Sequence, residues 1–139
     1  MQKILIIIHA PPYGSERCLS GLRLATALAG RDDKPAVSVF LMSDATILGL
    51  PNQIDGAGNG LQGMVEQLVA QGVDIRLCRT CALARGLAEL PLIPGTAIGT
   101  LVERATRFTI LLHLPDGHDA GQVQQAIVRK MRNLPRLLR

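Results

Sequence analysis

The segment Lys3-Ile-Leu-Ile-Ile-Ile-His9 opens the chain, and Ala10-Pro-Pro-Tyr-Gly14 follows it directly. A continuous run of aliphatic residues predicts a strand that is buried on both faces of a parallel sheet. Proline and glycine then interrupt that strand. A helix is expected to begin at Gly14 or Ser15, to carry Glu16 in its first turn and to end near Ala29. This order of strand, turn and helix favours an α/β fold.

The same alternation of strand and helix patterns continues along the chain. Further strands are expected at residues 36–42, 73–77 and 108–114. Helices are expected at residues 61–71 and 80–85, from Thr96 or Thr100 onward, and at residues 120–131. This order predicts right-handed βαβ units, and therefore a single three-layer domain with a mostly parallel sheet and helices on both faces. Functional groups in such sheets gather beyond the carboxyl ends of the strands, which here are residues 10–16, 43–48 and 78–86.

The length and composition of the chain set the class of protein. A chain of 139 residues, 47% of them hydrophobic, has the size of one globular domain with a real core. No apolar run approaches the roughly 20 residues of a membrane-spanning helix, so no membrane association is expected. The apolar start has no basic segment before it and no cleavage site after it, which argues against a signal peptide. Three cysteines do not make a disulfide framework, so a reducing, cytoplasmic setting is expected.

The formal net charge of +4 belongs to the end of the chain. Residues 129–139 hold five of the fifteen Lys and Arg residues and none of the eleven Asp and Glu residues. A nucleic-acid surface would need stacking aromatic side chains beside its basic residues. The aromatic residues are only Tyr13, Phe40 and Phe108. No nucleic-acid partner is therefore expected, and the basic run is interpreted as a solvated end.

A CxxC pair, Cys78-Arg79-Thr80-Cys81, lies at the expected junction of a strand and a short helix. The amide donors at a helix start favour thiolate over thiol, and Arg79 and Arg85 act in the same direction. Two thiols at this spacing share one helical face, where they can exchange a sulfur or form a disulfide. We therefore predict thiol or persulfide chemistry, with Cys78 as the more reactive sulfur because it lies nearer the helix start.

Other interpretations of the cysteines stay open. Free cysteine packs readily inside proteins, so Cys78 and Cys81 can be inert, and Cys18 is interpreted as a buried helix residue. The pair would supply half of a tetrahedral zinc site, but no metal and no cofactor are expected. A thioredoxin-like disulfide exchanger has the same spacing, but the order of strands and the Pro-Pro-Tyr-Gly loop do not fit that fold.

The residues Tyr13, Gly14, Ser15 and Glu16 form a second candidate region. A turn from strand to helix can bind an anion through backbone N–H groups, although a plain capped turn is the alternative. It is not a phosphate-binding P-loop, because no Gly-Lys-Ser/Thr follows. We predict that this loop forms a wall of the cysteine site, where Arg79 or Arg85 would stabilise an anionic sulfur species. Asp44 follows a strand end and can be either a helix cap or a site residue.

Several segments taken together resemble the DsrE/DsrF-like family of sulfur-relay proteins. The opening strand with Ala10-Pro-Pro-Tyr-Gly-Ser-Glu16 is followed, in the family's order and spacing, by Val39-Phe-Leu-Met-Ser-Asp-Ala45 and Leu77-Cys-Arg-Thr-Cys-Ala-Leu-Ala-Arg-Gly86. Leu90-Pro-Leu-Ile-Pro-Gly95 and Ile98-Gly-Thr-Leu-Val-Glu103 extend the match to the YchN-like branch. The resemblance runs from Met1 to about Ala105, and after that the sequence departs from the family pattern.

The resemblance implies a DsrE-like α/β sheet of about five strands with helices on both faces, assembled into homotrimers or homohexamers. In sulfur-relay members a cysteine at the position of Cys78 accepts a persulfide from a donor protein and passes it to an acceptor protein, whereas Cys81 is specific to the branch. We expect a DsrE/YchN-like domain at residues 1–114 and a basic, partly helical extension at residues 115–139. The expected function is that of a sulfur carrier or thiol relay, and the alternative is a non-catalytic oligomeric protein that binds a small ligand or a partner.

Overall fold

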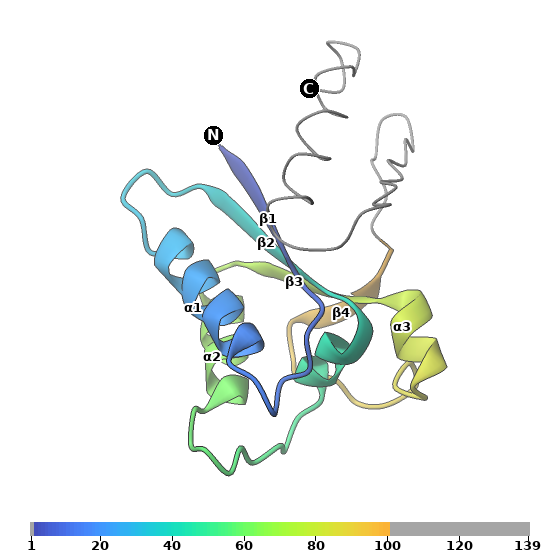
Figure 1. Cartoon of the computed structure of the whole chain (residues 1–139). Coiled ribbons are helices and arrows are strands. Elements are labelled where there is room, and N and C mark those ends of the chain that lie inside the picture. Colours follow the sequence, from blue (N-terminus) through green and yellow to red (C-terminus); the bar gives the residue numbers. More distant parts are fainter. Residues whose placement is uncertain (1, 101–139) are drawn as a thin grey trace, which may run out of the picture. The chain divides into compact units, whose positions relative to one another are not determined.

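The computed structural model of the protein describes residues 2–100 (Figure 1). In order along the chain, its elements are β1 (Lys3–Ile8), α1 (Arg17–Ala29), β2 (Ala36–Leu41), the 3-10 helix η1 (Ser43–Gly49), α2 (Leu61–Ala70), β3 (Asp74–Cys78), α3 (Arg79–Ala84) and β4 (Thr96–Gly99). The predicted strand at 108–114, the predicted helix at 120–131 and the predicted boundary after residue 114 lie outside the described residues.

The strands form a parallel sheet in the order β1-β2-β3-β4, so each strand pairs with its neighbours in sequence. Leu41 of β2 pairs with Ile8 on one side and with Leu77 on the other, and Cys78 pairs with Gly99. The predicted α/β class with a parallel sheet is confirmed. Residues 2–100 contain four strands, slightly fewer than the sheet of about five strands that was expected.

The core lies between one face of the sheet and the helices α1 and α2, which pack side by side (Figure 1). The side chains of Leu41, Ile75 and Leu77 are fully buried there against Leu22 of α1 and Leu68 of α2. Burial of this apolar surface stabilises the sheet, at roughly 1.5–3 kcal/mol for each large aliphatic side chain. The core therefore holds rigid the strand ends from which the cysteines and their neighbours extend.

The first strand is not buried on both faces, contrary to the prediction. Exposure alternates along β1, with Ile8 buried whereas Leu5 is 48% exposed and Ile7 is 46% exposed. Successive side chains of a strand point to opposite faces, and α1 and α2 cover the face that Ile8 contributes to. An all-apolar run cannot by itself tell how many faces are covered, because that depends on which helices pack against the strand.

The start of α1 also differs from the prediction. The helix begins at Arg17, so Glu16 is its N-cap residue rather than a member of its first turn, and no side chain caps it. Gly14 has a φ of 85°, a left-handed conformation in the middle of the loop before the helix. The buried Cys18 thiol donates a hydrogen bond to the Ala10 carbonyl at 2.9 Å. The loop bends through residues 12–16 before the helix begins, and the Cys18 contact ties the first turn of α1 back to it.

The segment after Gly95 forms a strand, so the predicted helix does not begin at Thr96; a helix from the alternative start, Thr100, would lie outside the described residues. Gly95 has a φ of 89°, and β4 follows at once, paired with β3 through Leu77 and Ile98. The Thr96 hydroxyl and backbone N–H both donate to the Ile93 carbonyl, at 2.8 and 3.0 Å. Pairing with the edge of β3 satisfies the backbone N–H and C=O groups of both strands. A local helix pattern in the sequence does not take this pairing into account.

None of the helices within residues 2–100 has both the length and the hydrophobicity needed to cross a membrane.

Candidate functional site

The cysteine pair lies where β3 passes into α3. Cys78 is the last residue of β3 and the N-cap of α3, and Cys81 lies within the helix. Both are free thiols and both are partly exposed. The predicted position of the pair at a strand-to-helix junction is confirmed, and it lies at the carboxyl edge of the sheet, where small molecules usually reach parallel sheets.

The neighbouring turn after β2 faces this junction. Ser43 follows the strand directly and has a φ of 50°, which is uncommon for a residue other than glycine. The hydroxyl of Thr46, which is fully buried, donates to the Ser43 carbonyl at 2.7 Å. Backbone strain of this kind costs of order 1–3 kcal/mol and persists only where neighbouring contacts impose it. The turn thereby packs against α3, the helix that carries Cys81.

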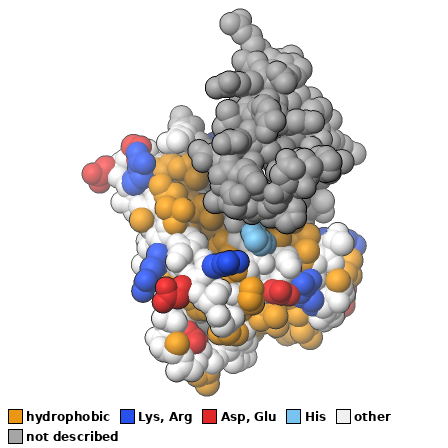
Figure 2. Space-filling view, in the orientation of Figure 1, with side chains coloured by type: hydrophobic (Ala, Val, Ile, Leu, Met, Phe, Trp, Pro, Cys, Tyr) orange, Lys and Arg blue, Asp and Glu red, His pale blue; other side chains and the backbone are white. Residues whose placement is uncertain are grey.

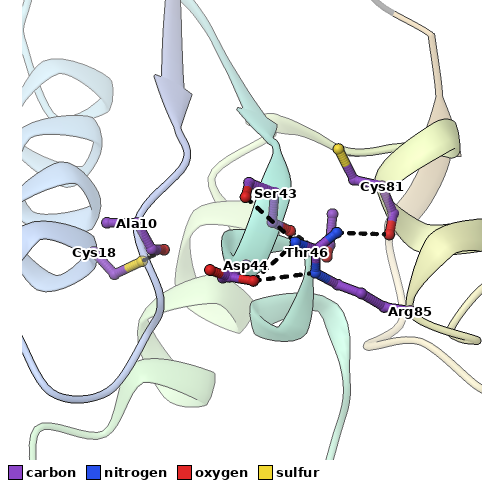
Figure 3. Close-up of polar contacts among 7 residues, drawn as sticks. All are labelled: Ala10, Cys18, Ser43, Asp44, Thr46, Cys81 and Arg85. Atoms are coloured by element: carbon purple, nitrogen blue, oxygen red, sulfur yellow. Dashed lines mark hydrogen bonds and ion pairs between the residues drawn. The ribbon is translucent and has the colours of Figure 1, made fainter. Parts of the chain in front are cut away.

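Arg85 joins this turn to α3 (Figure 3). Its guanidinium donates to the Asp44 carboxylate, with Nη2–Oδ1 and Nε–Oδ1 distances of 2.8 and 3.2 Å. It also donates to the Ser43 hydroxyl at 3.3 Å and to the Cys81 carbonyl at 3.2 Å. The Arg85 side chain is 29% exposed and that of Asp44 is 51% exposed. One cation thus ties together two segments that lie about forty residues apart in the chain.

These contacts act on the acidity of Cys81. The backbone N–H of Ser43 and a hydrogen bond from the Cys78 side chain lower the pKa of Cys81 below its ordinary value. The positive charge of Arg85 acts in the same direction, whereas burial and the Asp44 carboxylate oppose it. A lower pKa means more thiolate at neutral pH, and the thiolate is the nucleophilic form of cysteine.

Cys18 has the opposite character. It is completely buried in α1 and binds the Ala10 carbonyl (Figure 3). Burial raises the pKa of the Cys18 thiol to about 11, so this thiol stays protonated at neutral pH. The interpretation of Cys18 as a structural residue of the helix agrees with this environment.

In the predicted loop at Tyr13–Glu16, the side chain of Tyr13 contacts Gln53 and not the cysteines. The Tyr13 hydroxyl donates to the Gln53 side chain at 2.8 Å. Burial and the nearby Asp55 raise the pKa of Tyr13. Gln53 in turn donates to the carbonyls of Ile47 and Leu50, at 2.6 and 2.8 Å. The loop is therefore joined to η1 through Gln53, and its role as a wall of the cysteine site stays a prediction.

Of the predicted basic residues, the structure brings Arg85 to the cysteines in a defined contact. Arg79, Ser15 and Glu16 are exposed, and their predicted roles stay predictions. On the face shown in Figure 2, Lys and Arg side chains lie beside Asp and Glu side chains. Arg85 follows the same pattern, since Asp44 already pairs with its charge.

Ser43 was not among the predicted site residues, whereas Asp44 was considered as either a helix cap or a site residue, in a segment, 43–48, that was recognised as following a strand. The available signal was two polar residues placed directly after the apolar strand at 36–42. Their contact with α3 spans about forty residues and could not be seen from local sequence. No group of three or more His, Cys, Asp or Glu side chains within residues 2–100 is placed to hold a metal ion.

Comparisons with known proteins agree on one family. The family model described as DsrE/DsrF-like matches residues 2–108. Protein YchN of Escherichia coli (strain K12) is 50% identical over 105 residues, which cover 76% of this chain and 90% of that protein. An uncharacterized protein of Methanopyrus kandleri, MK0008, is 37% identical over 100 residues, which cover 70% of this chain and 79% of its own. The crystal structure of the ychN protein from E. coli superposes with a TM-score of 0.69 at 48% identity and covers 73% of this chain and 86% of that one.

Proposed function

Because this chain belongs to the DsrE/DsrF-like family, we propose that it carries sulfane sulfur as a persulfide on its CxxC pair. Cys78 is the carrier position by resemblance to sulfur-relay members, and Cys81 assists it. The single observation that supports this most is the arrangement at the β3–α3 junction, where both thiols are partly exposed and Arg85 ties the Cys81 carbonyl to Ser43 and Asp44. Two inert packing cysteines would have no need of such an environment.

The chemistry needs only what these residues supply. A thiolate attacks the outer sulfur of a donor persulfide, R–S–SH, and the donor leaves as the thiolate R–S⁻. One S–S bond forms and another breaks, so the transferred sulfur keeps its oxidation state and no redox cofactor takes part. The partly exposed position of both thiols at the edge of the sheet gives a donor protein or a small persulfide access to them.

The test is intact-mass spectrometry after incubation with a small-molecule persulfide. The wild-type chain is expected to gain the mass of one sulfur, which a reducing agent removes. The double variant Cys78→Ser/Cys81→Ser keeps Cys18 and serves as the matched control, because its one remaining cysteine is fully buried and is expected to stay unmodified. A wild-type chain that gains no sulfur would contradict the proposal.

We also propose that the protein works as a homo-oligomer, a trimer or hexamer by resemblance to its family. Exposed aliphatic side chains on β1 support this, because Leu5 and Ile7 are each about half exposed and apolar surface of this kind is commonly covered by self-association. Sulfur donor and acceptor proteins, and a cytoplasmic location, are parts of the same proposal.

A further inference from the structure

We infer that Asn59-Gly60 is a site of spontaneous covalent modification, at which the Asn59 side-chain amide is lost and an aspartyl or isoaspartyl residue is formed. The site lies in the loop between η1 and α2, and Gly60 is the N-cap residue of α2. This inference is independent of the proposed function, because it involves neither the cysteines nor Arg85. Water is the only co-reactant that the change requires.

Asp55 fixes the part of the loop that precedes the reactive pair. Its carboxylate accepts hydrogen bonds from the backbone N–H groups of Ala57 and Asn59, at 2.9 and 3.2 Å. Its backbone carbonyl accepts the N–H of Gly58 at 2.9 Å. Within the described part of the chain, no acceptor binds the next N–H along, that of Gly60. The nitrogen that attacks Asn59 is therefore free of the contacts that hold the N–H groups before it.

The reactive pair is open to solvent and sterically unhindered. Asn59 and Gly60 are both exposed. Gly60 has a φ of 64° and a ψ of 41°, a left-handed conformation, and a Cβ built on it would meet nothing within 4 Å. No side chain caps α2 at this end, and the first N–H groups of a helix have no partner within the helix. Because Gly60 has no Cβ, its nitrogen can approach Cγ of Asn59 with little steric resistance.

Two other residues of the loop have the same kind of side chain, and the structure disfavours reaction at both. Asp55 also precedes a glycine, but an ionised carboxylate is a poor electrophile. Hydrogen bonds from the Ala57 N–H and from Asn59 hold the pKa of Asp55 below its ordinary value, so it stays ionised at neutral pH. Asn52 is exposed, but it precedes Gln53, whose side-chain amide is bound to backbone carbonyls at the end of η1. The loop therefore leaves Asn59 as its reactive position.

The reaction balances in atoms and needs no oxidant or reductant. The Gly60 nitrogen loses its proton and attacks Cγ of Asn59. A bond forms between these two atoms, the bond from Cγ to Nδ2 breaks, and Nδ2 takes up a proton and leaves as ammonia. Water then opens the cyclic imide that remains. Cleavage of the bond from the Gly60 nitrogen to Cγ gives aspartate, and cleavage of its bond to the backbone carbonyl carbon gives isoaspartate, with the side-chain carbons now in the main chain.

Peptide mapping of the folded wild-type chain over time tests the site. The chain is kept at neutral pH and physiological temperature, and samples are digested at mildly acidic pH, where the reaction is slow, and sequenced by tandem mass spectrometry. Asn59 is expected to gain the mass difference between a hydroxyl and an amino group, and isoaspartyl methyltransferase is expected to label part of the product. Asn52 is the internal reference and is expected to react at least about tenfold more slowly, a barrier higher by about 1.4 kcal/mol. Equal modification of Asn52 and Asn59, or none at Asn59, would overturn the inference.

Two alanine substitutions separate the attack by Gly60 from a general effect on the loop. Gly60→Ala places a methyl group beside the attacking nitrogen and is expected to slow modification of Asn59 at least about tenfold. Gly58→Ala is the matched control, because Gly58 is also left-handed, with a φ of 72°, and also has open space where a Cβ would lie. Gly58→Ala introduces the same kind of backbone strain but leaves the residue after Asn59 unchanged, so its rate is expected to stay within about threefold of the wild type. Equal slowing by both substitutions would overturn the role of Gly60.

Discussion

A substitution at Gly49 is expected to change both the stability of the fold and the position of η1 beside the cysteine pair. Gly49 ends η1, the segment that begins with Ser43 and Asp44, and it is buried against β3. Its carbonyl accepts a hydrogen bond from the Ile93 backbone at 2.8 Å. We predict that Gly49→Ala destabilises the fold and displaces η1, and with it the contacts that η1 makes to Cys81.

The expected magnitude follows from the space beside Leu77. A methyl group on Gly49 would lie 2.5 Å from Cδ2 and 2.8 Å from Cδ1 of Leu77, far inside ordinary van der Waals contact. Leu77 is itself fully buried, so any shift of its side chain has to be accommodated within the core. Overpacking of a core in this way costs about 1–3 kcal/mol. The backbone of Gly49 is not left-handed, so the cost is one of packing alone.

Equilibrium unfolding in urea measures the effect. Gly49→Ala should reduce the free energy of unfolding by about 1–3 kcal/mol, with an unchanged dependence on urea. The matched control is Gly63→Ala, in the exposed first turn of α2, where a methyl group meets nothing within 4 Å; it should instead raise stability, by up to about 0.5–1 kcal/mol. If Gly49→Ala is as stable as the wild type, the packing of η1 against β3 is not as described.

Three further predictions follow from other contacts. Burial raises the pKa of Cys18 to about 11, so the neutral thiol contributes its full stabilisation below pH 9, and about 2 kcal/mol of folding stability should be lost as the pH rises from 9 to 11. Thermal unfolding of Cys18→Ala should lack this loss. The same pH dependence in the wild type and in Cys18→Ala would contradict the prediction. Thr46→Val removes the hydroxyl that holds the Ser43 carbonyl, so it should lower the free energy of unfolding by about 1 kcal/mol and slow the labelling of Cys81 by iodoacetamide at pH 6.5. Unchanged labelling would show that this turn does not influence Cys81. Light scattering should report a trimer or hexamer of the 139-residue chain, and Leu5→Lys/Ile7→Lys should shift it toward monomer; a wild-type monomer would refute the proposed assembly.

Local pattern was sufficient for much of the fold. The apolar runs at β2 and β3 and the periodic helix that became α2 lie within a residue or two of their predicted positions, because burial of one face imposes a period that sequence displays directly. The start of α1 and the nature of β4 were mispredicted. In both places a tertiary contact decides the structure: the hydrogen bond from Cys18 to Ala10 for α1, and pairing with the edge of β3 for β4.

The sequence by itself determined that this is a parallel α/β protein of the DsrE/DsrF-like family with a CxxC pair at the carboxyl end of a strand. Only the tertiary structure decided which groups from distant parts of the chain surround the cysteines. The pKa of a thiol depends on the charges and N–H groups around it; that of Cys81 is lowered first by the backbone N–H of Ser43, then by its motif partner Cys78, and to a smaller extent by Arg85, which Asp44 holds. Spacing within a motif reports which residues are neighbours in the chain, whereas the electric field at a sulfur atom depends on which residues are neighbours in space.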